Sequence, residues 1–156
     1  MSTDKPPAEV PGLANETLQH FDDICRSLRI IYFLAAGTCL GFYRDKNYMK
    51  GDNDIDIRVI CGDDKFEQLV QTLAEEGFSP ALEPGYERMH FRKNDILFDI
   101  KRADGTEFQF DTIYFNGWPY RVPYPVESYL ERLYGKGWKI HLEETGEKLL
   151  WTHHKE

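Results

Sequence analysis

The sequence has no long hydrophobic run and no recognisable leader segment. Its longest apolar stretch covers only residues 30–36, whereas a helix that crosses a bilayer needs about 20 apolar residues. The opening stretch MSTDKPPAEVPG lacks the basic start and the apolar middle of a secretory signal peptide. We therefore expect no membrane span and a cytoplasmic location.

Cysteine is also scarce. The three cysteines, Cys25, Cys39 and Cys61, are odd in number and show no Cys-x-x-Cys spacing. This pattern is not that of a disulfide framework or of a zinc site. We expect three reduced thiols, of which Cys25 and Cys39 lie among apolar neighbours and suit a core.

An excess of basic residues is missing as well. The chain has 27 acidic and 19 basic residues, which gives a net charge of −8. Proteins that grip nucleic acid nonspecifically, or that bind anionic membrane surfaces, need an excess of lysine and arginine. The charge balance therefore argues against both kinds of partner.

The apolar content is sufficient for one folded domain. Of the 156 residues, 41% are hydrophobic, and a chain of this length buries roughly two thirds of its unfolded surface without help from disulfides or metal. Residues 1–12 contain three prolines and few apolar side chains, which predicts a flexible N-terminal arm. We expect a single domain over 13–150 and a frayed tail over 151–156.

Hydrophobic periodicity alternates between helical and strand spacing along the chain. Helices are predicted, with Asn15 capping the first, at 16–29, 39–44, 65–76 and 126–134. Strands are predicted at 30–36, 54–60, 78–82, 87–92, 95–102, 107–115 and 118–122. We expect Asp104-Gly105 to join 95–102 and 107–115 as a hairpin. This order predicts an α+β (mixed α/β) domain, with a mixed β-sheet and helices packed on it.

The segment DNDIDI carries the most informative pattern. Residues two apart on a strand share a face, so Asp54 and Asp56 are expected to project side by side, with Ile55 and Ile57 in the core. Paired carboxylates suit Mg²⁺ or Mn²⁺, which bind phosphate substrates through a few carboxylates and water. An ordinary solvent-facing strand also alternates in this way, and for an isolated Asp-x-Asp that interpretation is the commoner one.

The preceding strand ends in a second informative feature, Gly37-Thr38. Glycine lets the backbone approach a phosphate closely, and the Thr38 hydroxyl can donate a hydrogen bond to it. A Gly-Thr pair alone is more often a simple turn. Next to the acidic strand, it predicts a two-part site that holds a phosphate and a metal on adjacent strands.

A third carboxylate would complete such a site. Asp99 and Asp111 lie in the two strands of the expected hairpin, and either could accept a proton from an attacking hydroxyl. Hairpin register leaves the choice open. Arg58, Arg92 and Lys101 are further basic residues near the same face, and we expect each to be a solvated or ion-paired charge at the surface.

Together these segments resemble the nucleotidyltransferase fold of the polymerase β-like superfamily, and more closely the LicD/fukutin family. The stretch GTCLGFYR is similar to the family's GTLLGxxR, and GDNDIDI to its WDDDIDI, with Gly51 and Asn53 in place of Trp and Asp. A C-terminal element also matches through Val122, Pro123, Pro125, Tyr129, Leu130, Tyr134, Gly135 and Trp138. The resemblance covers residues 16 to 140.

The resemblance implies a metal-dependent transferase. Such an enzyme would move a phosphate-linked group from a nucleotide-activated donor, of the CDP-choline or CDP-ribitol type, to a sugar or glycan hydroxyl. It further implies that Asp54 and Asp56 hold Mg²⁺ or Mn²⁺. Asp99 falls where the family has its later carboxylate, so it is preferred to Asp111 as metal ligand or base.

Three residues of the first motif are implied in donor binding. Gly37 and Thr38 would hold the donor phosphates, and Arg44 would offset their charge. Two alternatives stay open: an antibiotic-type nucleotidyltransferase that uses ATP or another NTP, and a catalytically silent binding or regulatory module on the same fold. In the enzymatic interpretations the partners are a nucleotide or activated donor and a sugar, glycan or other small-molecule acceptor.

Overall fold

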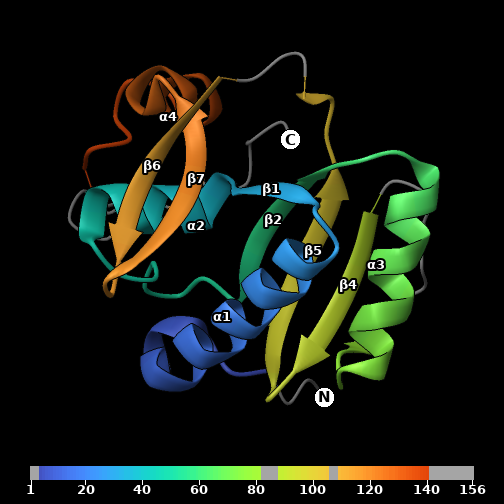
Figure 1. Cartoon of the computed structure of the whole chain (residues 1–156). Helices are drawn as coiled ribbons and strands as arrows, with labels where there is room; N and C mark the ends of the chain where they lie inside the picture. Colours follow the sequence, from blue (N-terminus) through green and yellow to red (C-terminus); the bar gives the residue numbers. More distant parts are fainter. Residues whose placement is uncertain (1–3, 82–87, 106–108, 141–156) are drawn as a thin grey trace.

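A computed structural model describes residues 4–81, 88–105 and 109–140 of the chain (Figure 1). Its centre is a five-stranded sheet in the order β1-β2-β5-β4-β3. The strands are Ile31–Leu34 (β1), Asp54–Ile60 (β2), Ser79–Pro80 (β3), Arg88–Lys93 (β4) and Ile96–Arg102 (β5). Within this sheet β2 pairs with β5 in parallel and the other pairs are antiparallel. The predicted α+β class with a mixed sheet is confirmed.

A separate two-stranded sheet consists of Gln109–Phe115 (β6) and Trp118–Tyr124 (β7). The turn between them, Asn116-Gly117, has a positive φ at both residues, as a tight hairpin turn requires. The predicted hairpin between 95–102 and 107–115 is wrong. Strand β5 has β2 on one side and β4 on the other, so neither of its edges is free to pair with β6.

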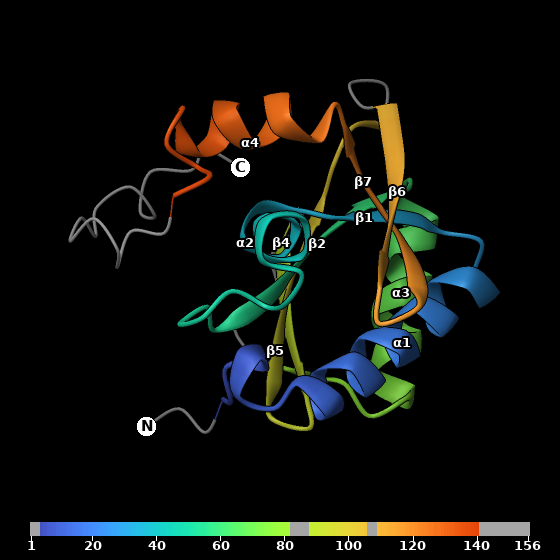
Figure 2. The same cartoon turned by 90° about the vertical axis from the view of Figure 1, so that its left-hand side faces the viewer.

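Helices occupy both faces of the main sheet. Pro11–Ser27 (α1) and Asp63–Glu75 (α3) lie on one side, whereas the short helix Ala36–Leu40 (α2) lies on the other (Figure 2). Phe21 of α1 stacks on Phe98 of β5 with ring centroids 5.5 Å apart, which fixes α1 on the apolar face. The π-helical turn Gly41–Asp45 (η2) continues α2, and Val126–Tyr134 (α4) packs against α2.

The first helix begins at Pro11, earlier than predicted. Proline suits the first turn of a helix because its missing N–H has no partner there anyway. Asn15 therefore lies inside α1, where its side-chain oxygen accepts a hydrogen bond from the Tyr48 hydroxyl at 2.6 Å. Upstream, Pro7–Glu9 forms a single 3-10 turn (η1).

The segment before α1 makes polar contacts with the edge of the main sheet. Asp4 forms an ion pair with Arg92 of β4, and the backbone N–H of Lys5 donates to the Asp95 carbonyl at 2.8 Å. The flexibility of this arm stays a prediction, and the predicted tail 151–156 lies outside the described residues. Among the residues that the structure describes, no helix has the length and hydropathy needed to cross a bilayer.

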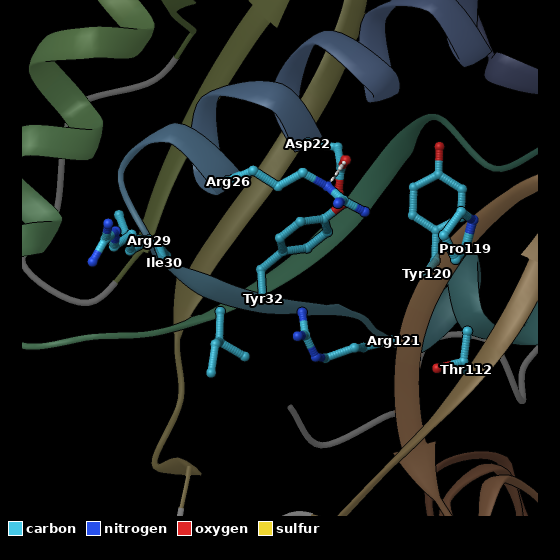
Figure 3. A pocket seen from close by; sticks show the side chains of 10 residues that line it. Asp22, Arg26, Arg29, Ile30, Tyr32, Thr112, Pro119, Tyr120 and Arg121 are labelled. Carbon is cyan, nitrogen blue, oxygen red and sulfur yellow. Dashed lines mark hydrogen bonds and ion pairs between the residues drawn. The ribbon is translucent and has the colours of Figure 1, made fainter.

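One buried carboxylate, Asp22, connects α1 with the rest of the domain. It accepts hydrogen bonds from the Tyr32 hydroxyl of β1 at 2.6 Å and from the Arg26 guanidinium at 2.6 Å. The indole N–H of Trp118, in β7, donates to it at 3.2 Å. Asp22, Arg26 and Tyr32 line a cavity of about 430 Å³ between α1, β1 and the hairpin, and Arg121 lines it as well (Figure 3).

Replacing this carboxylate tests whether it holds the hairpin and α1 together. Asp22→Ala leaves the Tyr32 hydroxyl and the Trp118 N–H without their acceptor, so we expect it to destabilise the fold by about 2–4 kcal/mol. Urea denaturation followed by tryptophan fluorescence measures the loss. A loss below about 0.5 kcal/mol would contradict this role for Asp22.

Candidate active site

The face of the sheet opposite α1 and α3 carries a row of ionisable side chains. Strand register places Asp56 of β2 beside Asp99 of β5, and Asp99 beside His90 of β4. Ile55 and Ile57 alternate with the acids and are fully buried, because successive side chains of a strand point to opposite faces. The predicted alternation of Asp54 and Asp56 with a buried apolar face is therefore confirmed.

Asp52 joins Asp54 and Asp56 in the acidic cluster, the name used below for these three side chains. One carboxylate oxygen of each lies within 4.8 Å of those of the other two. The sequence prediction of the site omitted Asp52 because it precedes β2, where strand alternation makes no prediction. The sequence signal for including Asp52 is the spacing of two residues, which continues from Asp54 and Asp56 back to Asp52 in the pattern Asp-x-Asp-x-Asp.

Gly37 leaves room for this cluster. A Cβ atom at Gly37 would lie 2.6 Å from the Asp52 Oδ2 atom and 3.4 Å from the Asp56 Oδ2 atom. The first distance is shorter than any ordinary contact, so a side chain there would displace the carboxylate. The structure thus brings Gly37 into contact with the acidic cluster, as a shared site requires.

Thr38 fastens the turn after β1 to the acidic strand. Its hydroxyl oxygen accepts a hydrogen bond from the Asp56 backbone N–H at 2.8 Å, and the side chain is buried. The Ala35 N–H donates to the Asp56 carbonyl at 3.1 Å. Both backbone groups of Asp56 are therefore held by the segment 35–38, which fixes the position of its carboxylate.

Burial and mutual repulsion raise the pKa values of the three carboxyl groups in the acidic cluster. Burial, and then the neighbouring Asp54 charge, raise the pKa of Asp52 to about 7. The pKa of Asp56 lies well above its usual range through burial and the charges of Asp54 and Asp52. Burial and the Asp99 charge also raise the pKa of Asp54. A bound cation would favour the ionised forms of these carboxyl groups, so three raised pKa values in one cluster indicate a cation site.

Asp99 behaves differently. Burial opposes its ionisation, but the Arg88 guanidinium donates two hydrogen bonds to it, at 2.8 and 2.6 Å. This bidentate contact and the positive charge of Arg88 hold the pKa of Asp99 below its usual range. The His90 Nε2 atom lies 3.6 Å from the same carboxylate. Asp99 is therefore an ionised neighbour of the cluster, paired on its far side with β4.

Arg58 differs from its predicted place, and Arg44 makes contacts that were not predicted. Arg58 was expected at the surface but is 3% exposed, and its charge opposes the pKa rise of Asp56. Arg44 was predicted to bind the donor. Its guanidinium donates to Asp45 at 2.8 Å and to the Trp138 carbonyl at 2.9 Å, contacts that tie η2 to the C-terminal segment. Donor binding by Arg44 stays a prediction.

Asp111 does not share the sheet that carries the cluster. It lies on β6 of the separate hairpin, is exposed, and accepts a hydrogen bond from the Thr112 backbone N–H at 2.8 Å. Asp99 pairs in register with Asp56 instead. The geometry therefore favours Asp99 over Asp111 as a further carboxylate beside the acidic cluster.

The donor set of the cluster fits a divalent metal. Hard carboxylate oxygens are the usual protein ligands of Mg²⁺ and Mn²⁺, and all three come from one short segment with one oxygen each within 4.8 Å of the others. Asp52, Asp54 and Asp56 would hold such an ion. Asp99 lies next in register to Asp56, and its carboxylate is held by Arg88.

Comparison with protein families gives one match over the central part of the chain. The family described as LicD/FKTN/FKRP, nucleotidyltransferase domain, matches residues 29–132. Ribitol-5-phosphate transferase FKTN of Mus musculus is 27% identical over an aligned length of 154, and the match covers 81% of this chain and 33% of that protein. The Homo sapiens protein of the same name is 25% identical with the same coverage. The chain thus spans about a third of the length of these relatives.

Solved structures share the fold. The lincosamide antibiotic adenylyltransferase LnuA, bound to lincomycin, superposes with a TM-score of 0.56 at 15% identity, covering 69% of this chain and 78% of that one. The structure of ANT(2")-Ia in complex with adenylyl-2"-tobramycin gives a TM-score of 0.51 at 16% identity, covering 69% and 67%. These similarities confirm the predicted nucleotidyltransferase fold.

The charge repulsion within the cluster predicts an unusual stability profile. A carboxyl group whose pKa is raised on folding destabilises the protein as the pH rises from its unfolded value near 4 through its folded value. Asp54→Asn removes one of the repelling charges. In EDTA at pH 8 we expect it to raise Tm by several degrees, since each kcal/mol shifts Tm by roughly 2–4 °C.

At pH 4, where protonation of the acidic cluster relieves the repulsion, the same substitution should change Tm less than at pH 8. Differential scanning calorimetry at both pH values measures the difference, with Asp111→Asn as the exposed control. A lower Tm for Asp54→Asn at pH 8 would show that the carboxylates do not repel one another in the folded protein.

Proposed function

This chain belongs to the LicD/FKTN/FKRP nucleotidyltransferase-domain family, and on that premise we propose that it is a metal-dependent transferase. It moves a phosphate-linked group from a nucleotide-activated donor, of the CDP-choline or CDP-ribitol type, to a hydroxyl of a sugar or glycan. The observation that carries the proposal is the acidic cluster, whose three carboxylates converge to within 4.8 Å against Gly37.

The names of the relatives support transfer of a phosphate-linked group. The FKTN proteins are named ribitol-5-phosphate transferases, and transfer of such a group to a hydroxyl makes a phosphodiester. This chain matches about a third of their length. Its own donor and acceptor are therefore part of the proposal.

The residues of the site take the following roles in the proposed reaction. A divalent ion, when bound, neutralises charge on the donor phosphates and on the transition state. The backbone at Gly37 admits a phosphate closely, and the Thr38 hydroxyl, which accepts from the Asp56 N–H, can donate its own proton to a phosphate oxygen. Binding at this turn orients the donor over the acidic strand.

Asp99 is the proposed base. Its carboxylate is ionised because the Arg88 guanidinium lowers its pKa, and in the proposed reaction it accepts the proton of the acceptor hydroxyl as the new oxygen–phosphorus bond forms. The bond from phosphorus to the nucleoside monophosphate breaks in the same step, and the nucleoside monophosphate leaves. Arg88 holds the Asp99 carboxylate through two hydrogen bonds and sets its orientation.

A donor screen tests the proposal. We expect CDP-choline or CDP-ribitol, with Mg²⁺, to raise Tm more than CTP or ATP at equal concentration, because a ligand stabilises the folded state according to its affinity. Product formation is then followed as release of CMP in the presence of sugar acceptors.

The other outcomes identify the other functions on this fold. Turnover of ATP or another NTP, without turnover of CDP-linked donors, would overturn the proposal in favour of a small-molecule nucleotidyltransferase. ATP turnover is worth testing because an antibiotic adenylyltransferase has the same fold. Absence of any metal-dependent binding heat, with or without nucleotides, would indicate a binding or regulatory module.

The choice of third carboxylate predicts a contrast between two single substitutions. Asp99→Asn keeps the shape of the side chain but loses the base, so we expect turnover to fall by about 10²-fold or more. Asp111→Asn, on the exposed hairpin, should keep turnover within about twofold of wild type. Steady-state kinetics with the donor found above measures both variants. Equal losses, or a greater loss for Asp111→Asn, would reverse the assignment.

A further inference from the structure

Ala36 lies at the corner between β1 and the Gly37-Thr38 turn in a strained backbone conformation. Its φ is +44°, in the left-handed region that residues with a Cβ atom seldom adopt. Such strain persists only where surrounding contacts hold it, and it is often found at functional sites. Something must therefore stabilise Ala36 in this conformation.

That contact comes from α4, far along the chain. The Tyr129 hydroxyl accepts a hydrogen bond from the Ala36 backbone N–H at 2.9 Å, and both groups are buried. Tyr129 is only 2% exposed, so water does not compete for the bond. Without the hydroxyl, a buried N–H would lose this partner at a residue that already strains the backbone.

The strained corner is connected directly to the acidic strand. Ala35, the residue before Ala36, donates its N–H to the Asp56 carbonyl at 3.1 Å. Thr38, two residues after Ala36, accepts the Asp56 N–H at 2.8 Å. Gly37 lies between these two residues. A Cβ atom added to Gly37 would lie 2.6 Å from the Asp52 Oδ2 atom. A rotation at Ala36 would move all three contacts together.

We propose that Tyr129 is a positioning residue for the acidic cluster. Its hydroxyl holds Ala36 in the left-handed conformation, and the corner so formed sets the places of Asp52 and Asp56. Tyr129 acts on the carboxylates through the backbone of residues 35–38. The proposal rests on the proposed function in one respect, that the acidic cluster binds a divalent metal.

Three variants separate the hydroxyl from the strain that it supports. Tyr129→Phe keeps the ring and removes the acceptor. Ala36→Gly removes the strain, because glycine adopts positive φ readily. The double variant combines both. Tyr32→Phe is the matched control, since it also removes a buried hydroxyl with a 2.6 Å hydrogen bond, but one that reaches Asp22 rather than the corner.

Calorimetric titration with Mn²⁺ is the first measurement. We expect Tyr129→Phe to weaken Mn²⁺ binding by about tenfold, and Ala36→Gly in that background to restore affinity to within about threefold of wild type. Tyr32→Phe should lower Tm while leaving Mn²⁺ affinity unchanged. Unchanged affinity in Tyr129→Phe, or no recovery in the double variant, would overturn the proposal.

Amide hydrogen exchange in EDTA provides a readout that needs no metal. In Tyr129→Phe the backbone N–H groups of Thr38 and Asp56 should exchange at least tenfold faster, whereas Tyr32→Phe should leave them as in wild type. If wild type binds no Mn²⁺, the proposed function fails, and this exchange still decides the role of Tyr129. Equal exchange rates in both variants would overturn it.

Discussion

The repulsion between three crowded carboxylates is the constraint around which this domain is arranged. Asp52, Asp54 and Asp56 each present an oxygen within 4.8 Å of the others, and their burial makes the repulsion stronger. Such an arrangement does not form by itself. It exists because the backbone of Asp56 is hydrogen-bonded on both sides, and because Gly37 leaves space for the Asp52 carboxylate.

The rest of the fold supplies the framework for this arrangement. The apolar face of the sheet packs on α1, with Phe21 against Phe98, so the charged side chains must gather on the opposite face. There β4 contributes Arg88, which pairs with Asp99, and α4 contributes the Tyr129 hydroxyl at the corner. The C-terminal motif is thus physically connected to the N-terminal one, although 93 residues separate Tyr129 from Ala36.

Local patterns predicted the elements well and their pairing poorly. The alternation of Asp54, Ile55, Asp56 and Ile57 predicted β2 and its buried face, because side-chain direction on a strand depends on spacing alone. The hairpin proposed after β5 failed because strand pairing depends on neighbours distant in sequence, here β2 and β4. For the same reason, the residues around Ala36 did not predict its hydrogen bond to Tyr129 of α4. The burial of Arg58 likewise depends on tertiary packing, which the alternation of charged and apolar residues along a strand does not predict.

The acidic cluster is proposed to be a metal site, in which backbone contacts hold three mutually repelling carboxylates together. Titration of Mn²⁺ into wild type at pH 7, in two buffers with different ionisation enthalpies, tests it most directly. Since the pKa of Asp52 is about 7, binding should displace on the order of half a proton or more, and the measured heat should differ between the buffers accordingly. Absence of binding, or binding whose heat does not depend on the buffer, would contradict the claim.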